Sequence, residues 1–232
     1  MVINQKRRKF SPSLAQKINV MRASVMGAND GILSVAGIVI GVAGATTNSF
    51  SIFISGIAGM IAGTVSMAMG EYVSVNTQKD AQQHTVQLEK LALKNDYDKE
   101  FATVKQKFLN SGISDKLAQK ATSEMMDQGS LTTVVREKYG INVYDYTNPY
   151  FAAIASMISF PTGSLLPLLA ITFISPTYKI PLTICAVAIA LAITGYLAAV
   201  LGKAIRYKGV VRNVISGLIT MLVTYLIGSL FA

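Results

Sequence analysis

Two acidic residues, Asp30 and Glu71, lie inside long apolar runs of this 232-residue sequence. The other ten acidic residues all fall in the polar stretch 80–145. A carboxylate inside a bilayer costs roughly 2.5–3.5 kcal/mol on insertion scales, and acids that occur there usually mark ion pathways. We therefore interpret both residues as part of a pathway for cations. The alternatives are that Asp30 pairs with Arg22 or Lys17 at the membrane surface, and that Glu71 is an acid at the end of a helix.

A methionine precedes Glu71 by one helical turn. Thr64, Met67, Glu71 and Ser74 follow a spacing of three or four residues, which puts them on one face of a helix. A thioether combined with oxygen ligands suits a transition metal better than Ca2+ or Mg2+. Met67 is therefore a candidate ligand in the same pathway, with ordinary core packing as the alternative.

The polar stretch offers a second set of possible metal ligands, namely Glu89, Glu100, Glu124, Met125, Met126 and Asp127. Glu124 and Asp127 share a helix face, and the alternative for that face is solvation with lysines balancing its charge. Residues 76–146 carry ten acidic and ten basic residues, so no strong net field draws cations there. His84, the only histidine, is a weaker candidate because a lone surface histidine is usually just solvated.

Composition indicates a membrane protein. The chain is 51% hydrophobic and 14% charged, whereas soluble domains carry about 25% charged residues. The net charge is +9, but the basic residues flank apolar runs as topology signals do, and no Trp is present, so nucleic acid is not an expected partner. The lone Cys185 excludes an intramolecular disulfide. No nucleophile–base pair or phosphate-binding loop is apparent, so we expect neither an enzyme nor a prosthetic group.

Five apolar runs are long enough to cross a bilayer as helices. The predicted spans are 23–45, 50–75, 148–174, 180–201 and 214–231. The expected fold class is an all-α membrane protein with five transmembrane helices and a helical insert between the second and third. The expected domains are a basic N-terminal segment at 1–22, the first two spans at 23–77, the insert at 78–146 and the last three spans at 147–232. Basic clusters in the N-terminal segment, the insert and the connector 202–212 predict that these parts are cytoplasmic and the C-terminus is outside.

Local signals divide the insert into about three short helices. Breaks are expected at 95–98 and 110–112, and Ser114 is a plausible N-cap for the helix that follows. The first helix is expected to continue the second span, because no Pro or Gly interrupts residues 71–93. In the third span, Pro161 and Pro167 predict a kink.

Two motifs resemble a known family. Ala28-Asn29-Asp30-Gly31 and the segment from Ser66 to Val75 (SMAMGEYVSV) look like those of the vacuolar iron transporter family, which includes the nodulin-21-like proteins. Gly163-Ser164-Leu165-Leu166-Pro167-Leu168 also resembles the family's third span. The resemblance covers nearly the whole chain. It implies a homodimer with a pore on its two-fold axis that exports Fe2+, and often Mn2+, from the cytosol in exchange for protons.

The resemblance also implies roles for residues. By this resemblance Asp30, Met67 and Glu71 line the translocation path, and the insert corresponds to a metal-binding domain. The nearest counterparts of that domain's ligands are Glu89, Glu100, Glu124, Met125 and Met126. Ala92 and Thr103 stand where further glutamates are expected, so the insert is poor in acids.

We therefore expect a divalent-metal transporter in a bacterial plasma membrane, with Fe2+ or Mn2+ as the transported ion and protons as the exchanged ion. The alternative is a non-transporting membrane scaffold or sensor whose helical module binds a partner. Acids inside apolar runs favour transport, because a scaffold has no need of them. The small-xxx-small spacing of Gly37 and Gly41, together with the family resemblance, predicts a homodimer with the first two spans at its interface.

Overall fold

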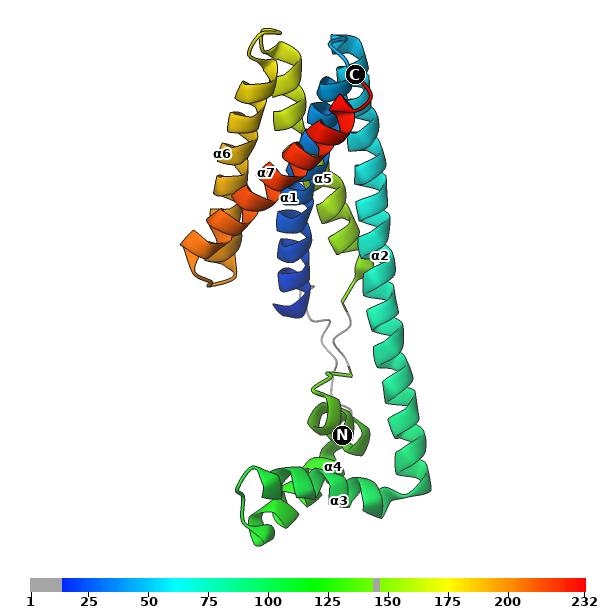
Figure 1. Cartoon of the computed structure of the whole chain (residues 1–232). Helices are drawn as coiled ribbons and strands as arrows, with labels where there is room; N and C mark the ends of the chain where they lie inside the picture. The colour runs from blue at the N-terminus through cyan, green and yellow to red at the C-terminus, as the bar shows by residue number, and fades with distance from the viewer. Residues whose placement is uncertain (1–13, 144–146) are drawn as a thin grey trace, which may run out of the picture. The chain divides into compact units, whose positions relative to one another are not determined.

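The structure, a computed structural model, describes residues 14–143 and 147–232. Within these ranges the chain forms seven helices and no strands (Figure 1). The helices are α1 (Leu14–Ala45), α2 (Ser49–Asn95), α3 (Tyr97–Asn110), α4 (Asp115–Tyr139), α5 (Pro149–Phe173), α6 (Lys179–Leu201) and α7 (Arg206–Ser229). Five of them, α1, α2, α5, α6 and α7, are long and apolar enough to cross a membrane. The predicted all-α class and its five spans are confirmed, while residues 1–13 of the predicted N-terminal segment lie outside the described residues.

The chain divides into two compact units. One unit contains the chain up to Val73 and from Pro149 onward, and we call it the membrane unit. The other is Ser74–Asn148, which we call the insert unit. The long helix α2 belongs to both, because it continues without interruption from Ser49 to Asn95. This confirms that the second span and the first helix of the insert are one helix.

Helix α1 forms the centre of the membrane unit. Its residues Val35, Ala36, Val39 and Ile40 are fully buried, and they pack in one core with side chains of α5, α6 and α7. Of the 18 most apolar consecutive residues of α1, 44% are buried, compared with 11% of the corresponding residues of α2 and of α7. Figure 1 shows α1, in blue, among the other spans of this unit. A residue on α1 is therefore positioned by three neighbouring helices.

Glycines allow α5 and α7 to approach α1 closely. A Cβ on Gly163 of α5 would collide with the backbone carbonyl of Ala28, and one on Gly228 of α7 would collide with that of Gly41. Gly37 and Gly41 themselves lie against side chains of α7. The small-residue spacing of α1 thus serves packing within the chain, and it gives no support to the homodimer that we predicted partly from it.

Two helix boundaries differ from the sequence prediction. Helix α7 begins at Arg206, eight residues before the predicted span at 214–231, so most of the basic connector is helical. Helix α1 likewise begins at Leu14 rather than at residue 23. Lys and Arg keep their charged heads in water while their stems cover apolar surface, so a helix can continue through them beyond its apolar run. Both prolines of the predicted third span lie inside α5, which continues through them.

The insert unit contains the end of α2 together with α3 and α4, which confirms the three predicted helical segments and their breaks. Asp96 caps α3 by accepting a hydrogen bond from the backbone N–H of Lys99 at 3.0 Å. Ser114 is the N-cap residue of α4, although its side chain makes no capping hydrogen bond. Gly129 has non-helical backbone angles and divides α4 into two pieces. A small core of Val104, Met126 and Val134, with flanking Leu93, Phe101 and Phe108, holds the unit together.

Candidate functional site

A polar contact inside the membrane unit fixes the rotation of α1. Asn29 Oδ1 accepts hydrogen bonds from Asn213 Nδ2 at 2.8 Å and from Thr194 Oγ1 at 3.2 Å, so Asn29 faces α6 and α7. Successive helical residues are turned by about 100°, so Asp30 points to another side of α1. Asp30 is exposed in the chain, and its carboxylate accepts a hydrogen bond from Ser34 Oγ at 3.0 Å.

The second intramembrane acid has a different environment. Glu71 is only 8% exposed, and its Oε2 lies 3.0 Å from Nη2 of Arg22. The other terminal nitrogen of Arg22 lies 3.7 Å from the sulfur of Met26. Arg22, which sequence reasoning offered as a possible partner of Asp30, is therefore the partner of Glu71. This ion pair also connects α1 to α2.

The register between α1 and α2 relates the two acids to the methionines. The two helices are joined by a short turn and run antiparallel, and Ile38 of α1 packs on Gly59 of α2. Asp30 lies eight residues before Ile38, and Met67 lies eight residues after Gly59. Both helices rise 1.5 Å per residue, so this register brings Asp30 and Met67 to the same level. The same register, one helical turn farther from the α1–α2 turn, brings Met26 to the level of Glu71. We call Arg22, Met26, Asp30, Met67 and Glu71 the α1–α2 seam.

The seam contains residue types that can bind a divalent transition metal. It contains two carboxylates, which are the only acidic residues in the sequence of the membrane unit, and two thioethers. Asp30 and Met26 are exposed and Met67 is half-buried, so the seam opens onto the surface of the chain. In the described ranges, no three His, Cys, Asp or Glu side chains converge on one point that could hold a metal. A few mixed ligands favour reversible binding of a transition metal rather than a permanent metal centre.

In the insert unit, two predicted metal ligands come together around a lysine. Lys138 Nζ lies 2.8 and 2.9 Å from the two carboxylate oxygens of Glu89 and 2.9 Å from Oε2 of Glu100. The hydroxyl of Tyr139 donates to Glu89 Oε1 at 2.7 Å. The side chains of Glu89 and Glu100 are only 6% and 7% exposed. We call these four residues the Lys138 cluster.

The cluster holds its charges at neutral pH. Burial alone would raise the pKa of Glu89, but hydrogen bonds from Lys138 and Tyr139 outweigh it, and the pKa lies below its ordinary value. Burial alone would lower the pKa of Lys138, but its hydrogen bonds to Glu89 and Glu100 outweigh burial, and the pKa is raised. The ammonium group therefore occupies the position between the two carboxylates that a metal ion would need.

The remaining predicted ligands of the insert do not join this cluster. Glu124 is exposed and lies 3.9 Å from Lys120, and Asp127 and His84 are also exposed. Met126 is 3% exposed and belongs to the apolar core, while Met125 is half-buried. The six predicted ligands are thus divided among a buried ion-pair cluster, an apolar core and a solvated helix face.

Several residues of these sites escaped the sequence analysis. Lys138 lies 49 residues from Glu89 and 38 from Glu100, so no periodicity connects them. No sequence pattern pointed to Met26, because its position at the same height as Glu71 follows only from the register between α1 and α2. Thr194 and Asn213 could have been identified from the sequence, because each is a polar residue within or beside an apolar run. Such residues usually form hydrogen bonds between helices.

Taken together, the fold and the seam define the class: an all-helical, multi-pass membrane protein with two carboxylates and two methionines at matching levels of its first two spans. The sequence profile of the VIT family matches residues 21–229. The chain therefore belongs to the VIT family, as the two motifs predicted.

Named relatives agree with this assignment. Vacuolar iron transporter homolog 2.1 of Arabidopsis thaliana is 32% identical over 212 residues, which cover 90% of this chain and 80% of the relative. Vacuolar iron transporter homolog 2 of Oryza sativa subsp. japonica is 32% identical over 213 residues, covering 91% and 90%. The vacuolar iron transporter of Acanthamoeba castellanii is 31% identical over 211 residues, covering 90% and 78%. All three are named as transporters, in agreement with the expectation that the chain is not an enzyme.

Proposed function

We propose that this protein transports Fe2+ or Mn2+ across a membrane along a path lined by Asp30, Met67 and Glu71. The observation that carries the proposal is the environment of Asp30, an exposed carboxylate on the central span, hydrogen-bonded by Ser34. A carboxylate at such a position is costly in lipid, and it is stabilised by water or a passing cation. Membership of the VIT family and the names of the relatives, which specify iron, support the same function.

The ion pair of Glu71 suggests how protons and metal are exchanged. A metal ion that binds Glu71 must displace Arg22 from the carboxylate, and a proton on Glu71 has the same effect on the pair. Metal and proton therefore compete for one group, which is the requirement for antiport. We propose that metal leaves the cytosol and protons enter, with the N-terminus and the insert on the cytoplasmic side of a bacterial plasma membrane, because basic residues cluster in these parts.

We propose that two copies of the chain form the pathway. The seam is open at the surface of one chain, with Asp30 and Met26 exposed. A second copy placed on this face would enclose the seam and double the number of its carboxylates. A homodimer with α1 and α2 at the two-fold axis therefore explains why Asp30 is exposed in a single chain.

The insert contributes less to metal binding in this proposal than the family resemblance implies. Lys138 already occupies the position between Glu89 and Glu100, and Met126 belongs to the apolar core. Capture of metal is therefore assigned to Glu124, Met125 and Asp127, as a weak site with few ligands. Such a site raises the rate at low metal concentration and leaves the maximal rate unchanged.

The test is metal flux into proteoliposomes that contain the full-length protein. Fe2+ under anaerobic conditions, Mn2+, Co2+ and Zn2+ are compared with and without a proton gradient. The proposal expects flux of Fe2+ or Mn2+ that a gradient of protons in the opposite direction accelerates. Glu124→Gln/Asp127→Asn is expected to slow flux only at low metal. Absence of flux for all four ions would reject transport and leave the scaffold or sensor alternative.

A further inference from the structure

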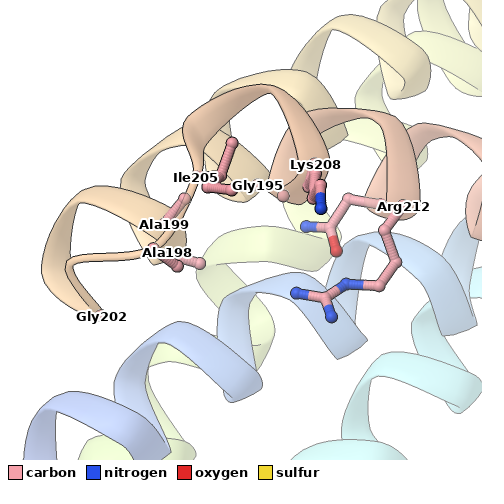
Figure 2. Close-up of a pocket in the computed structure, with 10 residues that line it drawn as sticks. Gly195, Ala198, Ala199, Gly202, Ile205, Lys208 and Arg212 are labelled. Atoms are coloured by element: carbon pink, nitrogen blue, oxygen red, sulfur yellow. The ribbon is translucent and has the colours of Figure 1, made fainter.

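The connection between α6 and α7 contains a pocket that the proposed transport path does not use. Its volume is about 590 Å3, and both helices and the residues between them line it. Figure 2 shows the side chains of Lys208 and Arg212 extending from α7, with Ala198 and Ala199 farther off, toward the α6–α7 connection. Lys208 and Arg212 are four residues apart and therefore share one face of α7.

Within residues 14–143 and 147–232, no carboxylate pairs with these two cations. The sequence contains no acidic residue after Asp145, and of the two acids in the membrane unit Glu71 is already paired with Arg22. In the parts of the chain that the structure describes, none of the ion pairs includes Lys208 or Arg212. Like charges four residues apart on a helix repel each other. The pocket therefore carries positive charge for which no ion-pair partner is found among the described residues.

The start of α7 strengthens this positive field. Its N-cap residue, Ile205, makes no side-chain capping hydrogen bond, and its first turn contains no acidic residue. A helix N-terminus carries a partial positive charge, so cations in the first turn are unfavourable there unless an anion is present. Arg206 does not line the pocket, because its guanidinium lies over the ring of Tyr196 at 5.7 Å.

We propose that this pocket binds the phosphate headgroup of an anionic membrane lipid. The phosphate accepts charge-assisted hydrogen bonds from Lys208 and Arg212, which are the strong kind. The side chain of Ile205, which lines the pocket and is 62% exposed, offers an apolar surface to the acyl chains. Basic pockets between membrane helices commonly bind lipid headgroups in this way. The other explanation for the basic residues is that they only orient the chain in the membrane, which requires charge but no pocket.

The test is binding of defined lipids to the detergent-solubilised, full-length protein, measured by native mass spectrometry, and it does not depend on transport. Phosphatidylglycerol and phosphatidylcholine are titrated separately, and inorganic phosphate is added as a competitor. The pocket variant is Lys208→Gln/Arg212→Gln. The matched control, Lys17→Gln/Lys203→Gln, removes the same charge from residues that do not line the pocket. Ala198→Phe fills the pocket and leaves both cations in place.

The wild type is expected to bind phosphatidylglycerol about tenfold or more tightly than phosphatidylcholine. The pocket variant and Ala198→Phe should lose this preference, and the control should keep it. Equal binding of the two lipids by the wild type would overturn the proposal. So would an equal loss in the control variant, since general surface charge would then explain the preference. Displacement of the lipid by millimolar inorganic phosphate would show that the pocket recognises free phosphate rather than a lipid.

Discussion

At the scale of single residues, the two intramembrane acids differ in what compensates their charge. Glu71 has a counter-ion in Arg22, at 3.0 Å, and is buried. Asp30 has a hydroxyl partner, Ser34, and is exposed. A dehydrated divalent cation therefore gains more at Asp30, where no cation of the protein has to leave first. This difference makes Asp30 the residue whose charge the pathway needs most.

Asp30→Asn is expected to abolish metal flux while the protein stays folded and inserted. Asparagine keeps the size of the side chain but lacks the charge that offsets a dehydrated divalent cation. Flux into proteoliposomes and the size-exclusion profile are measured together. Asp115→Asn is the matched control, because that carboxylate is 73% exposed in the insert unit, and it should transport normally. Normal flux in Asp30→Asn would exclude the proposed role.

The Lys138 cluster makes a prediction with a definite sign in pH. The lowered pKa of Glu89 contributes stability that is complete above about pH 4.5 and is lost as pH falls through the lowered value. The raised pKa of Lys138 contributes stability that is complete below about pH 10.5 and is lost as pH rises through the raised value. Between these limits the contribution of the Glu89–Lys138 pair to the stability of the insert unit is independent of pH.

Lys138→Met should make the stability of the insert unit depend on pH. Two carboxylates that are 6% and 7% exposed would lose their counter-ion, at a cost of about 3 kcal/mol at neutral pH. Burial then favours the protonated form of Glu89, so the variant should become more stable as pH falls below neutrality. Hydrogen exchange of α3 and α4, corrected for intrinsic rates, measures this change. Lys120→Met, which removes an exposed lysine, should have little effect, and a pH-independent Lys138→Met variant would contradict the cluster.

At the scale of helices, the sequence predicted what depends on local composition. Apolar length identified all five spans, and the Asn95-Asp96 break and Ser114 marked the starts of α3 and α4. The start of α7 was missed because Arg206 and its basic neighbours are compatible with either a loop or a helix end. The helix that packs against each glycine could not be predicted either. The spacing of Gly37 and Gly41 indicates that another helix packs closely there, but it does not identify that helix.

Two similar glycine-to-alanine substitutions should have different effects on stability. Gly163→Ala places a methyl group against the backbone carbonyl of Ala28, and backbone cannot move aside without separating α5 from α1. Gly70→Ala meets nothing within 4 Å. Alanine is a better helix former than glycine by about 1 kcal/mol, so Gly70→Ala should be neutral or stabilising while Gly163→Ala destabilises. Thermal unfolding of the detergent-solubilised protein measures both, and equal melting temperatures would refute this packing.

At the scale of the whole molecule, the site was predictable to the extent that charge in an apolar run is visible in the sequence. Asp30, Glu71 and Met67 were found in this way. The ion pair of Arg22 with Glu71 and the level shared by Asp30 and Met67 depend on how α1 and α2 are aligned, which no local pattern encodes. The insert shows the same limit, because Glu89 and Glu100 look like metal ligands until Lys138 is placed between them.

The proposed homodimer can be tested at the exposed face of α2. Ile61, Val65 and Met69 are 57%, 59% and 55% exposed, and they recur every four residues along one exposed face of α2. In a Cys185→Ser background, these residues are replaced one at a time by cysteine and the protein is oxidised in membranes. A disulfide requires Cα atoms within about 7 Å, so at least one position should crosslink if α2 lies near the two-fold axis. Ile189→Cys on α6 is the matched control at 63% exposure and should remain monomeric. A monomeric mass in detergent, together with no crosslink at any α2 position, would mean that a single chain has to form the pathway.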